Sequence, residues 1–275
     1  MSLLARLELH PSRKLGQNFL VDENCLEALV RVANPVAGER VLEIGPGAGA
    51  LTERLLAAGC QVTAIEFDRR LHDYLAEHFA DIPGLRLLQA DACRVDYNAL
   101  FPQESGTFRC IANLPYSCAS VLLAKLATLA NPPSELHVLL QREMAERLIA
   151  LPGSDAYGAL TVRIAFRYQA KIARMVPAGV FFPQPEVDSA FVSLVRRPEV
   201  PAEPLLDKAD SLVNAAFAQR RKQARKLLER FFPNGLFPQL LTAHGFAPEA
   251  RAEEFSPQDF LAFAKEVSKS NGYPD

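Results

Sequence analysis

The sequence lacks the features of a membrane-spanning or secreted protein. No apolar run approaches the roughly 18 residues that make a candidate transmembrane helix. The segment Met1–Arg6 has neither the charged region nor the apolar core of a secretory signal peptide. We therefore expect a cytoplasmic protein without a membrane partner.

Metal-binding and disulfide patterns are also missing. The five cysteines are an odd number, and their spacing does not form the close pairs of a zinc site. The five histidines are scattered, and none clusters with cysteine. These patterns argue against a disulfide framework. They predict reduced cysteines that pack as small apolar side chains, and no structural metal.

An excess of charge of one sign is absent as well. The net charge is −2 and the isoelectric point is near 6.2, which argues against a protein that coats nucleic acid indiscriminately. Of the 275 residues, 49% are hydrophobic and 23% are charged. Such a chain can bury a large core, and it is long enough for one large domain and one small one.

The most informative motif present is Asn113-Leu114-Pro115-Tyr116, which closes a predicted strand. The exocyclic amine of adenine is a poor nucleophile because its lone pair is delocalised, so a catalyst must hold both of its N–H groups. The side-chain oxygen of Asn113 and the main-chain carbonyl of Leu114, turned outward by Pro115, supply two acceptors. Tyr116 offers a ring on which a flipped or unpaired base stacks. Taken alone, the tetrapeptide is equally well explained as a strand end and a turn.

A glycine loop upstream has the form of a nucleotide-binding turn. The apolar strand pattern over 40–44 runs into Gly45-Pro46-Gly47-Ala48-Gly49-Ala50, and a helical pattern over 51–58 follows. Glycines let the backbone approach a ligand closely. The loop also fits the dinucleotide fingerprint, so it does not separate an NAD enzyme from a methyltransferase. Glu43 favours the methyltransferase, because its carboxylate would repel a pyrophosphate.

Three more predicted strands end at polar side chains. The strand over 61–65 leads to Glu66, at the offset where an acidic residue binds ribose hydroxyls. The strand over 85–89 leads to Asp91, placed to accept from an adenine amine, and the fourth ends at Asn113. Each acid alone is more simply a helix cap. Their joint appearance at successive strand ends favours a ligand site at one edge of a parallel sheet.

Three longer segments carry a resemblance to a known family. They are Glu43-Ile44-Gly45-Pro46-Gly47-Ala48-Gly49-Ala50-Leu51-Thr52, the Asn113–Tyr116 tetrapeptide, and Phe181-Phe182-Pro183-Gln184-Pro185-Glu186-Val187-Asp188-Ser189-Ala190. Together they resemble the ribosomal RNA adenine dimethyltransferases, most closely the bacterial small-subunit type. The resemblance spans nearly the whole chain, because segments 14–20 and 251–257 resemble the family's terminal motifs.

The resemblance implies S-adenosylmethionine as cofactor and 16S rRNA within the immature 30S subunit as partner, with two adjacent adenosines near the 3′ end dimethylated. It implies that Asn18 and Leu20 contact the cofactor. It assigns the loop with Gly45, Gly47 and Gly49 to the methionine part.

The remaining roles follow from the same resemblance. Glu66 is assigned to the ribose, Asp91 to the adenine, and Asn113 to the space between donor and target. Phe181 would meet the flipped base opposite Tyr116, although an aromatic residue packed on the core is the simpler explanation.

One departure concerns the adenine pocket. Asp91 follows Ala90 here, whereas the family usually has a glycine before this aspartate, and Cys93 stands two residues beyond. The assignment of Asp91 to the adenine is weakened accordingly.

A basic amphipathic helix is predicted between Arg220 and Arg230. One side carries Arg221, Lys222, Arg225 and Lys226, and another is apolar. Such a charge run is usually a solvated face, but beside an adenine site it predicts contact with RNA phosphates. Arg142, after a predicted strand over 136–140, is either a further RNA contact or an ion-pair partner at a helix start.

Alternating strands and helices predict an α/β fold: a Rossmann-like class I methyltransferase with a seven-stranded, mostly parallel sheet and an antiparallel edge strand. The proline-rich charged stretch over 196–204 marks a linker to a small all-helical C-terminal domain. We therefore expect a methyltransferase domain over 1–198 and an RNA-binding domain over 199–275, in a monomer.

Three other functions remain open at this point. A DNA adenine methyltransferase would share the tetrapeptide, but it would normally need a larger sequence-reading domain than the stretch after the linker. A 23S rRNA dimethyltransferase would share the motifs, but we expect that group to be more basic. A ribosome-assembly factor would bind the immature subunit, with catalysis secondary.

Overall fold

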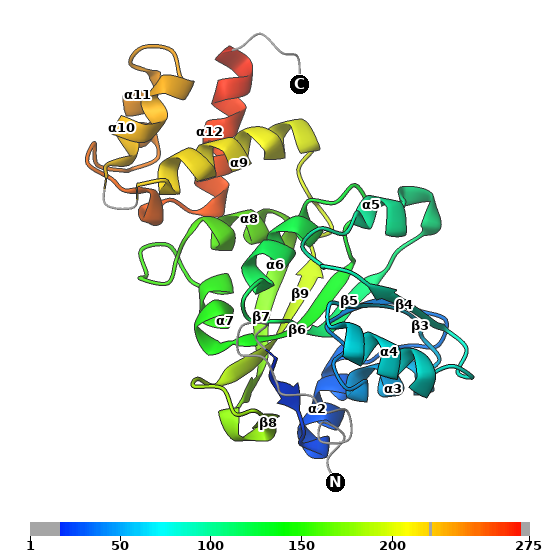
Figure 1. The fold of residues 1–275 in the computed structure, drawn as a ribbon. Helices are drawn as coiled ribbons and strands as arrows, with labels where there is room; N and C mark the ends of the chain where they lie inside the picture. The colour runs from blue at the N-terminus through cyan, green and yellow to red at the C-terminus, as the bar shows by residue number, and fades with distance from the viewer. Residues whose placement is uncertain (1–16, 220–221, 271–275) are drawn as a thin grey trace. The chain divides into compact units, whose positions relative to one another are not determined.

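The computed structural model describes residues 17–219 and 222–270. Contacts between Cα atoms divide the chain into two compact units, drawn in Figure 1. The first contains residues up to Ala145 together with Ala170–Arg196, and the second contains Glu146–Gln169 and the chain from Arg197 onward. The segment 146–169 therefore groups with the helical unit. The expected division into a methyltransferase domain over 1–198 and an RNA-binding domain over 199–275 stays a prediction.

A seven-stranded sheet forms the centre of the first unit, which confirms the predicted α/β class. Its strand order is β4-β3-β2-β5-β6-β9-β7. The first five strands pair in parallel, with Ile44 of β2 opposite Ile65 of β3. The strands are β2 (Arg40–Ile44), β3 (Gln61–Glu66), β4 (Leu85–Gln89), β5 (Arg109–Asn113), β6 (Glu135–Gln141), β7 (Tyr168–Val176) and β9 (Ser189–Arg196).

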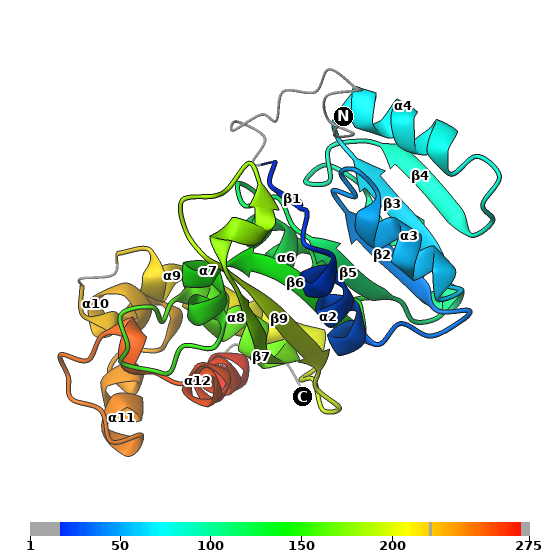
Figure 2. The same ribbon diagram turned by 90° about the horizontal axis from the view of Figure 1, so that it is seen from below.

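The parallel arrangement brings several strand ends to one edge of the sheet. Figure 2 shows β2, β3 and β4 side by side, with α3 and α4 running along them. Near the other end of the sheet, β9 pairs antiparallel with β6, with Val138 opposite Val192. The predicted antiparallel component is thus present, and β7 forms the outer edge beyond β9.

A second, two-stranded sheet was not predicted from the sequence. Strand β1 (Phe19–Leu20) pairs antiparallel with β8 (Phe181–Phe182), so that Phe19 lies opposite Phe182 and Leu20 opposite Phe181. Two-residue strands are too short to show a period-2 pattern. Their pairing joins the N-terminal segment to the proline-rich segment before β9.

Helices of the first unit bury apolar faces against the sheet. Helix α2 begins after Asp22, whose side chain accepts from the Cys25 N–H at 2.6 Å as an N-cap. Buried residues of α2 and α3 share one core cluster with alternate residues of the strands. These helices are α2 (Glu23–Ala33), α3 (Ala50–Ala57), α4 (Arg69–His78), α5 (Tyr97–Leu100) and α6 (Ala119–Ala127), with short 3₁₀ turns over Gln103–Ser105 and Ala178–Val180.

The second unit is helical around an aromatic core. Phe237, Phe255, Phe260 and Phe263 are fully buried there, and pairs of these rings meet edge to face, as Phe255 and Phe263 do at 5.4 Å. The unit contains α8 (Ala159–Arg167), α9 (Glu203–Phe217), α10 (Ala224–Leu228), α11 (Leu236–Ala243) and α12 (Pro257–Ser270), with 3₁₀ turns over Glu229–Phe231 and Ala252–Glu254. Helix α7 (Arg142–Leu148) spans the point where the two units divide.

The predicted basic helix is shorter than expected. Helix α10 begins only at Ala224, because the chain at Gln223 is extended and forms a bridge with Arg251. A continuous helix over 220–230 was therefore wrong. Arg221 lies outside the described residues, while Lys222, Arg225 and Lys226 are exposed, and Arg225 pairs with Glu229 at 3.3 Å.

Candidate active site

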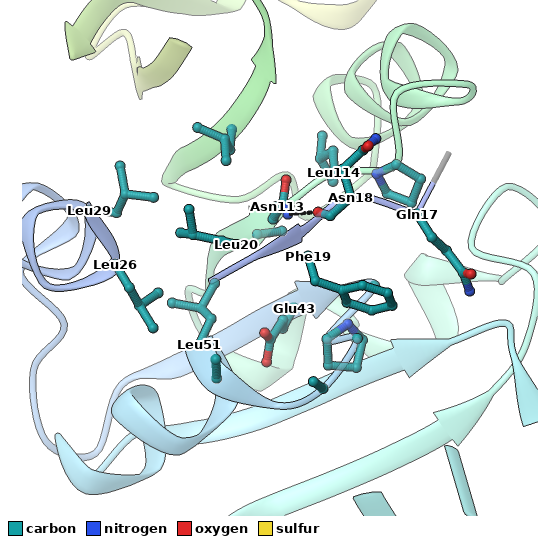
Figure 3. A pocket seen from close by; sticks show the side chains of 18 of the residues that line it. Gln17, Asn18, Phe19, Leu20, Leu26, Leu29, Glu43, Leu51, Asn113 and Leu114 are labelled. Carbon is teal, nitrogen blue, oxygen red and sulfur yellow. Dashed lines mark hydrogen bonds between the residues drawn. The ribbon is translucent and has the colours of Figure 1, made fainter. Parts of the chain in front are cut away.

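A pocket at the carboxyl ends of β2, β3 and β5 brings together most of the predicted site residues. Its volume is about 960 Å³ when the open mouth is included. Strand β1 runs across it beside Asn113 (Figure 3). Its walls include ten of the predicted residues: Asn18, Leu20, Glu43, Gly45, Gly47, Glu66, Asn113, Leu114, Pro115 and Tyr116.

The glycine loop is tied to its neighbours on both sides. The N–H of Gly47 donates to Oε2 of Glu66 at 3.2 Å. A Cβ built on Gly45 would lie 3.4 Å from Cγ of Pro115, so the loop and the Asn113–Tyr116 turn lie side by side with no room for a larger side chain between them. The two motifs found separately in the sequence therefore form adjoining walls of one pocket.

The structure gives a packing reason for Gly49, and its assignment to the methionine part stays a prediction. Gly49 does not line the pocket, and its φ of 87° is in the left-handed region that favours glycine. A Cβ there would lie 2.8 Å from a methyl group of Leu75 and 2.9 Å from the Phe79 ring. The third glycine thus allows α3 to start directly against α4.

Two buried carboxylates make the pocket receptive to a cation. Glu43 is 1% exposed and Glu66 is 5% exposed. Burial raises the pKa of Glu43 to about 8; the hydrogen bond from Thr52 at 2.7 Å opposes this rise, and the nearby Glu66 adds to it. Burial also raises the pKa of Glu66, against the N–H groups of Asp68 and Gly47 that stabilise its charged form. A cationic ligand would favour ionisation of both groups.

The Asn113 amide is oriented by the N-terminal segment. Its Nδ2 donates to the main-chain carbonyl of Asn18 at 3.0 Å (Figure 3). Since a carbonyl can only accept, this contact distinguishes the nitrogen of the amide from its oxygen. The oxygen is left to accept from another group, as the proposed adenine contact requires.

Tyr116 is held at its hydroxyl end. Its Oη and the Oγ of Ser189, the first residue of β9, are 2.6 Å apart. Burial raises the pKa of Tyr116, while the Ser189 contact lowers it. The phenol therefore serves as an anchor, and the half-buried ring lines the pocket as a surface for stacking.

Asp91 lies outside the pocket walls. Its Oδ1 accepts from the Cys93 N–H at 2.9 Å, and its Oδ2 is 3.5 Å from Nε of Arg94. It does follow β4, as predicted, in the loop that leads to α5. The assignment of Asp91 to an adenine stays a prediction.

Phe181 is buried in the structure. This side chain is only 3% exposed and packs in the core, whereas the neighbouring Phe182 is 52% exposed. Alternation along β8 turns the two rings to opposite sides. The simpler explanation, an aromatic residue packed on the core, therefore holds for Phe181 in this conformation, and its contact with a base stays a prediction.

Two residues of the site were missed in the sequence. The Phe19 ring lies against the glycine loop, since a Cβ on Gly47 would be 3.0 Å from it. Thr52 is fully buried and donates to Glu43. The position of Thr52 in the first turn of α3, 9 residues after Glu43, was a usable signal, whereas the position of Phe19 depends on the unpredicted β1–β8 pair.

Other predictions can be compared with the described residues only. Within 17–219 and 222–270, no three His, Cys, Asp or Glu side chains are placed to hold a metal ion. The described helices include none long and apolar enough to cross a membrane. All five cysteines are free thiols. Arg142 is the exposed first residue of α7, and its role in binding RNA stays a prediction.

The sheet order, the glycine loop and the Asn113 turn define a Rossmann-like class I methyltransferase. The chain belongs to the ribosomal RNA adenine dimethylase family, whose model matches residues 10–269. It is thus an enzyme of the class that methylates adenine in ribosomal RNA.

Relatives of similar length support this membership. The chain is 42% identical over 266 residues to the ribosomal RNA small subunit methyltransferase A of Brucella suis, covering 95% of this chain and 94% of that protein. It is 41% identical over 267 residues to the protein of the same description from Xanthobacter autotrophicus, covering 95% and 91%.

Solved structures share the fold over both units. A dimethyladenosine transferase from Plasmodium falciparum superposes with a TM-score of 0.74 at 24% identity, covering 92% of this chain and 98% of that one. The 23S rRNA methyltransferase ErmE gives a TM-score of 0.70 at 25% identity, covering 91% and 100%.

Proposed function

We propose that the protein transfers methyl groups from S-adenosylmethionine to the N6 amines of two adjacent adenosines near the 3′ end of 16S rRNA. Each amine is methylated twice, within the immature 30S subunit. The observation that carries the proposal is the Asn113–Tyr116 turn, which adjoins the glycine loop in one pocket. The 41–42% identity to small subunit methyltransferases favours 16S over 23S rRNA as the substrate.

The pocket's chemistry fits the cofactor. The two buried carboxylates Glu43 and Glu66 would compensate a sulfonium and an ammonium group, and Glu66 would accept from ribose hydroxyls. S-adenosylmethionine, when bound, supplies an activated methyl group with a good leaving group. The site residues that would hold it are Asn18, Leu20, Glu43, Gly45, Gly47, Glu66 and, from the loop after β4, Asp91.

The chain's own part in the reaction is to orient the target amine. In the first transfer the Asn113 oxygen and the Leu114 carbonyl accept its two N–H groups, which bends the nitrogen toward a tetrahedral shape and exposes its lone pair. In the second transfer one N–H group remains to be held, and each transfer releases one proton to solvent. The base stacks on Tyr116, which requires an unpaired or flipped adenosine. Since the amine becomes acidic once methylated, no strong base is needed, and positioning carries most of the rate.

The basic residues of the helical unit support RNA binding. Lys222, Arg225 and Lys226 are exposed, and Arg142 and Arg221 complete the proposed set. A single chain supplies every residue of the proposed methyl-transfer site, so we propose a monomer. Because we propose the immature 30S subunit as the substrate, we also propose that the protein acts in the cytoplasm.

A labelling experiment separates this function from the alternatives. Methyl-labelled S-adenosylmethionine is supplied with unmethylated 30S subunits, free 16S rRNA, 50S subunits and duplex DNA in parallel, and the label is mapped after digestion. Label in dimethyladenosine from 30S subunits supports the proposal. Label from 50S precursors or DNA would move the protein to another substrate, and no label with retained 30S binding would favour an assembly factor.

A further inference from the structure

Lys125 makes an unusual set of contacts outside the pocket. Its Nζ donates to the main-chain carbonyl of Cys93 at 2.9 Å and to that of Val95 at 2.8 Å. It also lies 5.3 Å from the centre of the Tyr97 ring, as a cation–π contact. Both carbonyls belong to residues 91–96 between β4 and α5, which we call the Asp91 loop.

The Asp91 loop is held from outside at three carbonyls. Besides the two that accept from Lys125, the Ala92 carbonyl accepts from the buried Tyr97 hydroxyl at 2.9 Å. Within the loop, the Asp91 carboxylate accepts from the Cys93 N–H, and the Asp91 main-chain carbonyl accepts from the N–H groups of Arg94 and Val95. The direction of the Asp91 side chain therefore depends on how these carbonyls are anchored.

Lys125 belongs to the helix that follows the Asn113–Tyr116 turn. Helix α6 starts at Ala119, and the N–H of Cys118, its N-cap residue, donates to the Pro115 carbonyl at 3.2 Å. Lys125 lies near the other end of this helix. One side chain thus connects the element that continues from the Asn113–Tyr116 turn with the loop that carries Asp91.

Replacing Lys125 by a residue without a donor would leave the carbonyls of Cys93 and Val95 without this hydrogen bond. A charged donor shared by two carbonyls is stronger than a neutral one, and a partly buried carbonyl that loses its donor is unfavourable. The loop would turn to reach water, and Asp91 would turn with it. Methionine has nearly the same length as lysine but no donor, so it tests the contact without removing the packing.

We infer that Lys125 is a positioning residue. It holds the Asp91 loop in the conformation in which Asp91 accepts from the adenine of the cofactor, and it connects this loop to the helix that follows the Asn113–Tyr116 turn. This inference rests on the proposed function, because it takes S-adenosylmethionine as the ligand. It assigns a role in cofactor affinity to a side chain that does not line the pocket.

The test compares Lys125→Met with Lys125→Arg and with the matched control Lys171→Met, an exposed lysine on β7. Calorimetry of the full-length protein measures S-adenosylmethionine binding. We expect Lys125→Met to weaken binding about tenfold, the effect of about one net hydrogen bond to a charged donor. Lys125→Arg should recover most of the affinity, and Lys171→Met should bind as the unaltered protein does. With saturating cofactor, kcat of Lys125→Met on 30S subunits should stay within about twofold of the unaltered enzyme, while its KM for cofactor rises.

A double-substitution cycle separates positioning from general stabilisation. If Lys125 acts through Asp91, then Lys125→Met combined with Asp91→Asn should bind no more weakly than Asp91→Asn alone, within about twofold. Independent effects that multiply would overturn the inference. So would equal affinity of Lys125→Met and Lys171→Met, or a loss of kcat with unchanged KM. If the unaltered protein does not bind S-adenosylmethionine, the proposed function itself fails, and the inference fails with it.

Discussion

The side-chain amide of Asn113 is hydrogen-bonded to the main chain of Asn18, with Nδ2 donating to the carbonyl at 3.0 Å. The two residues are far apart in the sequence, yet this contact decides which way the Asn113 amide faces. The N-terminal segment therefore orients Asn113 and also forms part of the pocket wall.

The first prediction concerns Asn113 itself. Asn113→Ala removes the acceptor for the target amine, and we expect loss of methyl transfer by at least about 100-fold, in the range of other lost preorganised contacts. Cofactor affinity should change little, since Gly47, Glu66 and Glu43 remain. Transfer is measured with labelled cofactor and binding by calorimetry, with the exposed Asn214→Ala as the control. Complete loss of cofactor affinity would contradict the prediction.

Phe181 and Phe182 should respond in opposite ways to truncation. Phe181 is packed in the core, so Phe181→Ala should lower the free energy of unfolding by about 3–5 kcal/mol. Phe182 is half exposed, and Phe182→Ala should stay within about 0.5 kcal/mol of the unaltered protein. Urea unfolding measures both. A stable but inactive Phe181→Ala protein would instead indicate that this ring leaves the core to meet the base.

The ionisation of Glu43 should make cofactor binding depend on pH. Because its pKa is raised to about 8, the group is largely protonated below that pH and ionised above it. A cationic ligand favours the ionised form, so affinity should rise by up to about tenfold per pH unit as the pH approaches 8 and then level off.

Glu43→Gln should remove this dependence, while the exposed Glu77→Gln should keep it. Calorimetry between pH 6 and 9 provides the measurement. A pH profile that is the same in both variants would assign the titration to another group.

Acid stability should depend on His137. This side chain is buried between Glu135 at 2.7 Å and Ser193 at 3.0 Å. Burial lowers its pKa below the ordinary value of 6.5, against the Glu135 contact that raises it. The unfolded chain therefore binds a proton first as the pH falls below about 6.5, and stability declines from that point.

Glu135 should add to the acid sensitivity at lower pH. Burial raises the pKa of Glu135, but the hydrogen bond from His137 and the charge of Arg109 lower it by more, so the pKa lies below its ordinary value of 4.5. The stabilising contribution of Glu135 is therefore lost only as the pH falls below 4.5. In thermal unfolding between pH 4 and 8, His137→Gln should show a smaller slope between pH 5 and 6.5 than the unaltered protein. The exposed His78→Gln serves as the control, and equal slopes would contradict the assignment.

The exposed basic residues of the helical unit should contribute to RNA binding through charge alone. Lys222→Ala with Lys226→Ala should weaken 16S rRNA binding and reduce the slope of log affinity against log salt by about one to two. Lys171→Ala and Arg86→Ala provide a control pair of equal charge. Filter binding at several salt concentrations measures the slope, and an unchanged slope would show that these side chains do not contact phosphate.

The sequence predicted well where the strands end and which polar residues follow them. The pattern over 40–44 with its glycine loop, the strand ending at Glu66 and the tetrapeptide at Asn113 were all placed correctly, because buried parallel strands are apolar throughout and end abruptly at polar residues. The parallel pairing then decides which ends meet.

What the sequence could not predict depended on contacts between distant short segments. The orientation of Phe181 follows from its pairing with Leu20, and neither two-residue strand has a pattern of its own. The helix over 220–230 was predicted too long because spacing alone does not show that Gln223 bridges to Arg251. The packing role of Gly49 was not predicted either, because a sequence does not distinguish a glycine that faces a ligand from one that faces Leu75.

The pairing of β1 with β8 has a consequence for how the protein is made. About 160 residues separate Leu20 from Phe181 in the chain. During synthesis the first strand emerges long before its partner, so one wall of the pocket stays unformed until most of the chain has left the ribosome. The pocket therefore lacks its full set of contacts until the residues of β8 have been synthesised. The pocket is completed only after roughly the first 180 of the 275 residues have been synthesised.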